Sequence, residues 1–230
     1  MTVKILVAAL LIMVCSCNSA PDKKAAPAPG VSEDSTVEVI DTVLTKETIS
    51  FFNRSGYENY ARGIDKDFDW SRFHMVDSWK DDTVQQKTYQ PDKSFFALYG
   101  PFLKYSPDSS MFIDLDSYNI SLSKTASGEL EGREEGPDTE VSLVDLKAKH
   151  KKRLVFLGPG GSVEDGGWLD NDNLVLIGLQ DDPDGNSKIP VVWKYHIPTH
   201  TFFLFQSPDS IASQQIDRWR KERLKGVKIL

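Results

Sequence analysis

An internal repeat limits the folds that this chain can adopt. Residues 104–114 align with residues 167–177 at an offset of 63 positions. Each copy has an aromatic residue, Tyr105 or Trp168, followed by a polar turn and an apolar stretch. Polar turn residues before an apolar, β-branched stretch are typical of antiparallel hairpins. The repeat therefore predicts the same kind of hairpin twice.

Two more apolar stretches follow each copy. They are residues 141–146 and 153–157 after the first copy, and residues 191–195 and 201–205 after the second. Four stretches separated by turns predict a four-stranded antiparallel sheet. The fold class is therefore expected to be mainly β, with two four-stranded antiparallel blade-like sheets. The two repeat units cover about residues 101–157 and 165–206.

The turn of the first copy is Ser106-Pro107-Asp108. With this turn between the inner two strands, residues 101–206 resemble two blades of a TolB-like β-propeller. The resemblance implies blade-like sheets. Because a closed propeller needs about four or more blades, we expect an incomplete propeller or a sandwich of two packed sheets.

A helix and a hairpin are predicted before the repeats. Thr45 suits the N-cap of a helix that contains Phe52 and ends near Gly63. Beyond Gly63 the apolar residues alternate, which predicts a hairpin of residues 73–79 and 83–89.

A C-terminal helix is predicted over residues 208–225, with Ser207 as N-cap and Gly226 as the stop. Trp219 would anchor this helix on a sheet. The end of the helix is basic, which suits the helix dipole or, alternatively, contact with anionic lipid head groups. The basic residues are Arg218, Arg220, Lys221, Arg223 and Lys225.

The first residues have the pattern of an export signal. Lys4 precedes an apolar run over residues 5–14, which is too short to span a bilayer. The segment Val14-Cys15-Ser16-Cys17 resembles the lipobox of bacterial lipoproteins. This predicts a signal peptide over residues 1–16 and lipidation of Cys17, with an ordinary secretory signal as the alternative.

A lipidated Cys17 would anchor the chain to a lipid bilayer, because buried acyl chains bind membranes strongly. Residues 17–44 would then be the lipidated cysteine and a tether rich in Pro and polar residues, and residues 45–230 the β-rich globular domain. The expected location is the cell membrane or outer membrane, facing the periplasm or the cell exterior. Asn18 slightly favours the outer membrane.

The formal net charge of −7 argues against nucleic acid as a partner, because nucleic-acid binding needs a basic surface. We expect no cofactor and no metal. His196 and His200 are four residues apart, but Pro198 between them favours a turn over a helical metal site. The loop at Asp182 lacks the acid and glycine positions of an EF-hand.

Asp114 and Asp116 are the candidate acid pair. Two residues apart on a strand, they would point the same way at a separation of about 6.6 Å. Paired carboxylates can act as acid and base in glycoside hydrolysis. The plainer interpretations are a solvent-facing strand or hydrogen bonding to turn amides.

The sequence therefore predicts a membrane-anchored, extracytoplasmic lipoprotein with a non-catalytic binding or scaffolding role in the cell envelope. Its expected partners are the bilayer and an envelope protein. The alternative is a polysaccharide or cell-wall hydrolase that uses Asp114 and Asp116. Exposed aromatic candidates for a binding surface are Trp79, Tyr99 and Tyr118.

Overall fold

The computed structural model describes residues 41–81, 86–183, 185–212 and 218–230. These residues belong to one compact unit. The predicted signal peptide, Cys17 and most of the predicted tether lie outside the described residues. The helices are α1 (Lys46–Ser55), α2 (Tyr57–Ile64), α3 (Lys93–Tyr99) and α4 (Arg218–Arg223), with short 3-10 helices η1 (Trp70–Arg72) and η2 (Gly100–Phe102).

The strands form three sheets. Sheet A contains, in spatial order, β1 (His74–Lys80), β12 (Thr201–Gln206), β11 (Ser187–His196), β10 (Asn173–Asp181) and β9 (Ser162–Trp168), and β13 (Ile211–Ala212) also pairs with β11. Sheet B contains β2 (Gln86–Thr88), β8 (His150–Leu157), β7 (Thr139–Asp145), β4 (Met111–Asp114) and β3 (Lys104–Tyr105). Sheet C contains β14 (Val227–Ile229), β6 (Leu130–Glu134) and β5 (Ile120–Lys124).

The fold is mainly β with antiparallel pairing in sheets A and B, but the expected pair of four-stranded sheets is wrong in number. The predicted strands of the first unit are β3, β4, β7 and β8, and those of the second are β9 to β12. Each set gains an outer strand, because β2 pairs with β8 and β1 pairs with β12. An open edge presents unpaired N–H and C=O groups, which a further strand satisfies.

The predicted hairpin of residues 73–79 and 83–89 is also wrong. Its two halves are β1 and β2, and they belong to different sheets. Alternation of apolar residues identifies a strand but not its partner. Each half pairs instead with the last strand of a longer set, β1 with β12 and β2 with β8.

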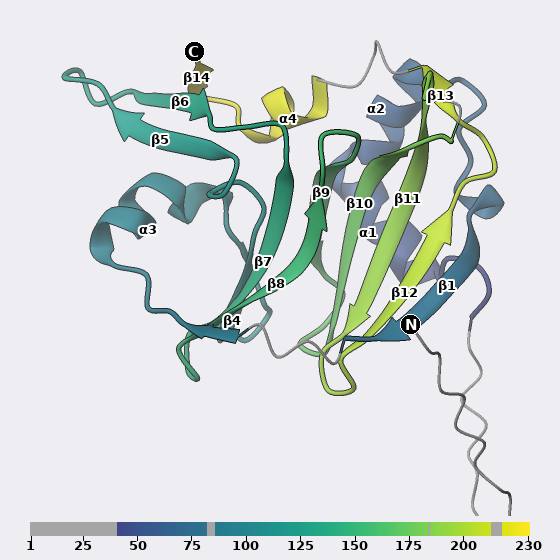
Figure 1. Cartoon of the computed structure of the whole chain (residues 1–230), viewed down its shortest axis with the longest axis horizontal. Coiled ribbons are helices and arrows are strands. Elements are labelled where there is room, and N and C mark those ends of the chain that lie inside the picture. The colour runs from purple at the N-terminus through teal and green to yellow at the C-terminus, as the bar shows by residue number, and fades with distance from the viewer. Residues whose placement is uncertain (1–40, 82–85, 184, 213–217) are drawn as a thin grey trace, which may run out of the picture. The chain divides into compact units, whose positions relative to one another are not determined.

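Sheets A and B pack face to face through a shared apolar core (Figure 1). Alternate residues of strand β10 face opposite sides of sheet A. Leu174 and Leu176 enter the inter-sheet core, whereas Val175 and Ile177 pack toward α1 and α2. On the far side of sheet B, Phe112 packs against α3. Helices therefore cover part of the outer face of each sheet.

The N-terminal helix is confirmed, with one break. Thr45 caps α1 through a 3.4 Å hydrogen bond from the amide of Thr48 to its Oγ1. Gly56 ends α1 with a φ of 87°, a conformation that favours glycine, and α2 begins at the next residue. Phe52 lies in the core beneath these helices.

Among the described residues of the C-terminal helix predicted over 208–225, Arg218–Arg223 are helical, and residues 213–217 lie outside the described part of the chain. Ile211 and Ala212 instead pair with Lys188 and Ser187 of β11, because this end of β11 offers an unpaired backbone edge. Trp219 packs against Tyr57 and Tyr60 as an anchor. Within the described residues, no helix has the length and apolar character needed to cross a membrane.

Candidate functional site

Asp114 and Asp116 are buried, so the solvent-facing interpretation is wrong. Strand β4 ends at Asp114, whose Oδ1 accepts hydrogen bonds from the amides of Asp116 (3.2 Å) and Ser117 (2.9 Å). Its Oδ2 accepts from the hydroxyl of Ser117. This carboxylate therefore closes the turn after β4, in agreement with the turn-amide interpretation.

Asp116 lies beyond the strand and pairs with Arg223 of α4. Both side chains are buried. Burial raises the pKa of Asp116, while the guanidinium of Arg223 opposes this effect. The pair joins segments that are 107 residues apart in the chain. Arg223 is thus part of the interior and not of a basic surface facing lipid.

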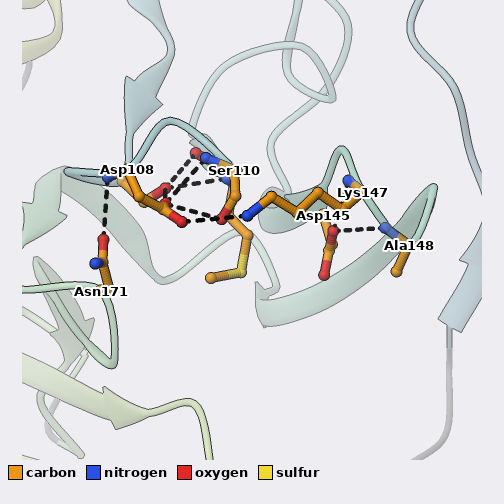
Figure 2. A network of polar contacts seen from close by, with 8 residues as sticks. Asp108, Ser110, Asp145, Lys147, Ala148 and Asn171 are labelled. Carbon is orange, nitrogen blue, oxygen red and sulfur yellow. Dashed lines mark hydrogen bonds and ion pairs between the residues drawn. The ribbon is translucent and has the colours of Figure 1, made fainter.

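The two repeat units touch at their equivalent turns (Figure 2). The amide of Asp108 donates to Oδ1 of Asn171 at 3.1 Å, and these two residues occupy matching positions in the repeats. The Asp108 carboxylate accepts from Ser106 and Ser110, and these hydrogen bonds lower its pKa. Lys147 approaches the same carboxylate at 3.5 Å.

Backbone hydrogen bonds bring the other turns to the same end of the molecule. The amide of Leu146 donates to the carbonyl of Ser110 (2.9 Å), and the amide of Ile197 donates to the carbonyl of Asp172 (2.8 Å). We call this assembly of the β3–β4, β7–β8, β9–β10 and β11–β12 turns the turn end.

A cleft of about 230 Å³ lies at the turn end between sheets A and B. We call it the inter-sheet cleft, and its lining residues come from both sheets. They are Gln86, Met111, Leu143, Asp145, Ala148, His150, Lys152, Tyr195, Ile197 and His200. Polar groups that converge on a partly apolar cleft are the usual make-up of a ligand site.

A chain of polar contacts forms one wall of this cleft. Lys152 Nζ lies 2.9 Å from Oδ2 of Asp81 and donates to the hydroxyl of Tyr195 at 2.8 Å. The same hydroxyl lies 3.0 Å from Nδ1 of His200. We call Asp81, Lys152, Tyr195 and His200 the cleft network. Lys152 and Tyr195 are buried, Asp81 is partly buried, and His200 is exposed.

The direction of these hydrogen bonds follows from the charge states. Burial would lower the pKa of Lys152, but its bonds to Tyr195 and Asp81 outweigh burial and raise it. Burial raises the pKa of Tyr195, against the effect of Lys152. An ammonium group only donates, so the Tyr195 hydroxyl accepts from Lys152 and donates to Nδ1 of His200. Nε2–H of a neutral His200 is then left as a donor.

The two histidines singled out from the sequence have different surroundings. His200 lines the cleft, whereas Nδ1 of His196 lies 2.7 Å from Oγ1 of Thr199 in the same turn. In the described part of the chain, no group of three or more His, Cys, Asp or Glu residues is arranged to hold a metal. The Asp182 loop is a hairpin connection between β10 and β11.

Sequence analysis missed the cleft network. Lys152 belonged to a basic stretch that is usually solvated, but it reaches into the interior from β8. One signal was present: Lys152 and Leu154 are two residues apart on a strand, so they share a face. An apolar partner at this spacing indicates that the lysine points inward.

Comparison with protein-family models, with curated proteins and with solved structures finds no match for this chain.

Proposed function

We propose that this chain is a lipid-anchored lipoprotein of the bacterial cell envelope whose domain has a non-catalytic binding role. Acylated Cys17 would hold it in the cell membrane or outer membrane, with the domain facing the periplasm or the cell exterior. The lipobox-like segment at residues 14–17 supports the anchor. The observation that supports binding is the inter-sheet cleft, walled by the cleft network.

A buried charge pair beside a cleft is costly to the fold. Replacing such pairs with apolar residues is often neutral or stabilising, so stability alone is a weak reason to keep them. Lys152 and Asp81 are both largely buried, yet they orient Tyr195 and through it the exposed His200. A binding role accounts for this arrangement, because fixed polar groups determine which ligand fits.

The raised pKa values of Lys152 and Tyr195 favour hydrogen bonding over base or nucleophilic catalysis. Lys152 remains an ammonium and Tyr195 remains a phenol near neutral pH. A general base or nucleophile needs the opposite, a lone pair available near the working pH. Both groups are therefore suited to hydrogen bonding.

The alternative is a polysaccharide or cell-wall hydrolase that uses Asp114 and Asp116. Its carboxylates would have to reach a substrate, but Asp114 holds a turn and Asp116 pairs with Arg223. Neither residue lines the inter-sheet cleft. The geometry supports this alternative less well than a binding role.

We also propose that the four-strand sets in sheets A and B correspond to two TolB-like blades capped by helices. The indole Nε1 of Trp168 on β9 donates to the carbonyl of Lys104 on β3 at 2.8 Å, so the first strands of the sets are neighbours. In a propeller, the blades are arranged around a central axis, and we expect the first strands of adjacent blades to be neighbours.

The anchor is tested by expressing the full chain in a Gram-negative bacterium fed with an alkyne-tagged palmitate. We expect label on the natural sequence and on Cys15→Ser, and none on Cys17→Ser, which should also leave the membrane fraction. Cys15→Ser is the matched control, because it changes a cysteine two positions away. Label that persists in Cys17→Ser would contradict the proposed anchor.

A further inference from the structure

The lining of the inter-sheet cleft combines apolar side chains with hydrogen-bonding groups. The apolar group is Met111, Leu143, Ala148 and Ile197, and the polar group is Gln86, Asp145, His150, Lys152, Tyr195 and His200. A ligand that satisfies both needs a C–H face and a rim of hydroxyl or amide groups.

The charges in the cleft favour a neutral ligand. Lys152 is matched by Asp81 at 2.9 Å, so its charge is already balanced. Asp145 is then the remaining formal charge of the lining when the histidines are neutral. Its Oδ1 accepts from the amides of Lys147 (2.8 Å) and Ala148 (2.7 Å). An anion would meet this carboxylate, and a cation would meet the ammonium of Lys152.

The size of the cleft restricts the ligand further. Its volume of about 230 Å³ is below the range of roughly 300–1,000 Å³ that is usual for drug-sized molecules. One six-membered ring with its substituents is therefore the expected occupant, and not an extended peptide or an acyl chain with its head group.

An aromatic series leads outward from the cleft. The ring of Tyr195 contacts Phe202 with centroids 4.4 Å apart, and Phe202 stacks on Trp79 at 5.1 Å. Trp79 is 37% exposed. This packed aromatic row holds the ring of Tyr195 and so fixes the position of its hydroxyl at the cleft.

We propose that the inter-sheet cleft binds one neutral sugar residue of a glycan, with His200 and the Tyr195–Lys152 pair as the polar contacts. This inference rests on the proposed binding function and names its ligand class. The Nε2–H of His200 donates to a ring hydroxyl, and the apolar side chains pack against the C–H face of the sugar. Acetylated amino sugars of cell walls and plain hexoses of other glycans share this chemistry.

Binding is measured on the detergent-solubilised full chain by saturation-transfer NMR and titration. The probes are N-acetylglucosamine, glucose, galactose and mannose, with glutamate and inorganic phosphate as charged probes. We expect saturable binding of at least one sugar. Preference for N-acetylglucosamine over glucose would indicate a cell-wall source, and the reverse preference a plain hexose glycan.

Two variants tie the binding to the cleft. His200 has a φ of 54°, so His200→Asn is used because asparagine tolerates this conformation. His200→Asn and Tyr195→Phe should each weaken sugar binding by about tenfold, the effect of one lost hydrogen bond. His196→Asn changes the same turn outside the cleft lining and should leave the affinity unchanged.

Three results would overturn the sugar assignment: glutamate or phosphate binding more tightly than every sugar, no saturable sugar binding, or equal affinity in His200→Asn and the natural sequence. Failure of the proposed anchor would be seen separately, because the palmitate-labelling experiment does not involve any sugar. If glutamate or phosphate bound in a way that depends on His200, the chain would still have a binding role, but its ligand would be a charged molecule and not a sugar.

Discussion

Two ion pairs in this protein are both buried, but their surroundings differ. Arg223 and Asp116 have side chains that are 5% and 4% exposed, and Leu224 beside them is in the core. Lys152 and Asp81 have side chains that are each 9% exposed, and Lys152 lines the inter-sheet cleft. Asp114 and Arg220 also act electrostatically on Asp116 of the first pair, whereas the second pair continues through Tyr195 to the exposed His200.

This difference separates a structural pair from a candidate binding pair. A sealed ion pair can only hold segments together, here α4 and the turn after β4. A pair beside a cleft can also transmit its orientation to groups that meet a ligand. Burial of charge therefore does not identify a functional site by itself, and access to a cleft must accompany it.

The largest effect is expected from Arg223→Met. It leaves the Asp116 carboxylate buried without its partner, which typically costs about 3–5 kcal/mol in the free energy of unfolding. Urea unfolding followed by tryptophan fluorescence measures this loss. Arg220→Met on the same helix is the control, because Arg220 pairs with the exposed Glu134 at 3.5 Å and lowers the pKa of Asp116 less than Arg223 does, so its loss should cost less than about 1 kcal/mol.

A double variant sharpens this result. Asp116→Asn combined with Arg223→Met removes both charges, so it should be more stable than Arg223→Met alone. Equal losses in Arg220→Met and Arg223→Met would mean that the Asp116 pair is not sealed, and the contrast between the two buried pairs would disappear.

The second largest effect is expected from Lys152→Met. Water in the cleft can solvate part of the Asp81 charge, so we expect a loss of about 1–3 kcal/mol, smaller than for Arg223→Met. Sugar binding should also weaken, because Tyr195 loses its donor. Lys228→Met is the control, since the side chain of Lys228 is 71% exposed and pairs with Glu131 at 3.2 Å. Matching losses in stability and binding for both lysines would contradict a special role for Lys152.

The sequence allowed the strands of the repeats to be predicted, but not the contacts that make a site. Leu174 to Ile177 alternate between two cores, and this pattern is visible in the chain itself. The partners of Asp116 and Lys152 are 107 and 43 residues away, in Arg223 and Tyr195. No local pattern encodes such pairing, because it arises only when the sheets stack.

The errors have a common physical origin. The helix expected from residue 208 has good capping residues, yet Ile211 and Ala212 pair with β11. The halves of the expected hairpin likewise join two different sheets. In both cases an open strand edge competes with a local preference, and tertiary hydrogen bonding prevails.

Tyr195→Phe should have a smaller effect on stability. Removing the hydroxyl leaves one Lys152 proton without an acceptor, at a cost of about 1 kcal/mol in urea unfolding. If Lys152 and Tyr195 act together, the double variant with Lys152→Met should lose less than the sum of the single losses. Strict additivity would show that the network is not coupled.

The smallest effect concerns two aspartates of the first repeat, whose pKa values move in opposite directions from 3.8. Burial raises the pKa of Asp116, so its folded state binds a proton more tightly and its contribution to stability grows as the pH falls toward 3.8. Hydrogen bonds from Ser110 and Ser106 lower the pKa of Asp108, so its contribution is present above 3.8 and is lost as the pH falls below that value.

Unfolding free energies measured from pH 7 downward test these signs with Asp116→Asn and Asp108→Asn. Relative to Asp116→Asn, the natural sequence should gain stability as the pH falls, because its buried carboxylate becomes neutral. Relative to Asp108→Asn, it should lose its advantage, because the turn carboxylate loses the charge that its donors stabilise. Asp108 lies in the turn that contacts Asn171, whereas Asp116 lies in the buried pair with Arg223. If the stability differences of both variants changed with pH in the same direction, the two carboxylates would not differ in solvation.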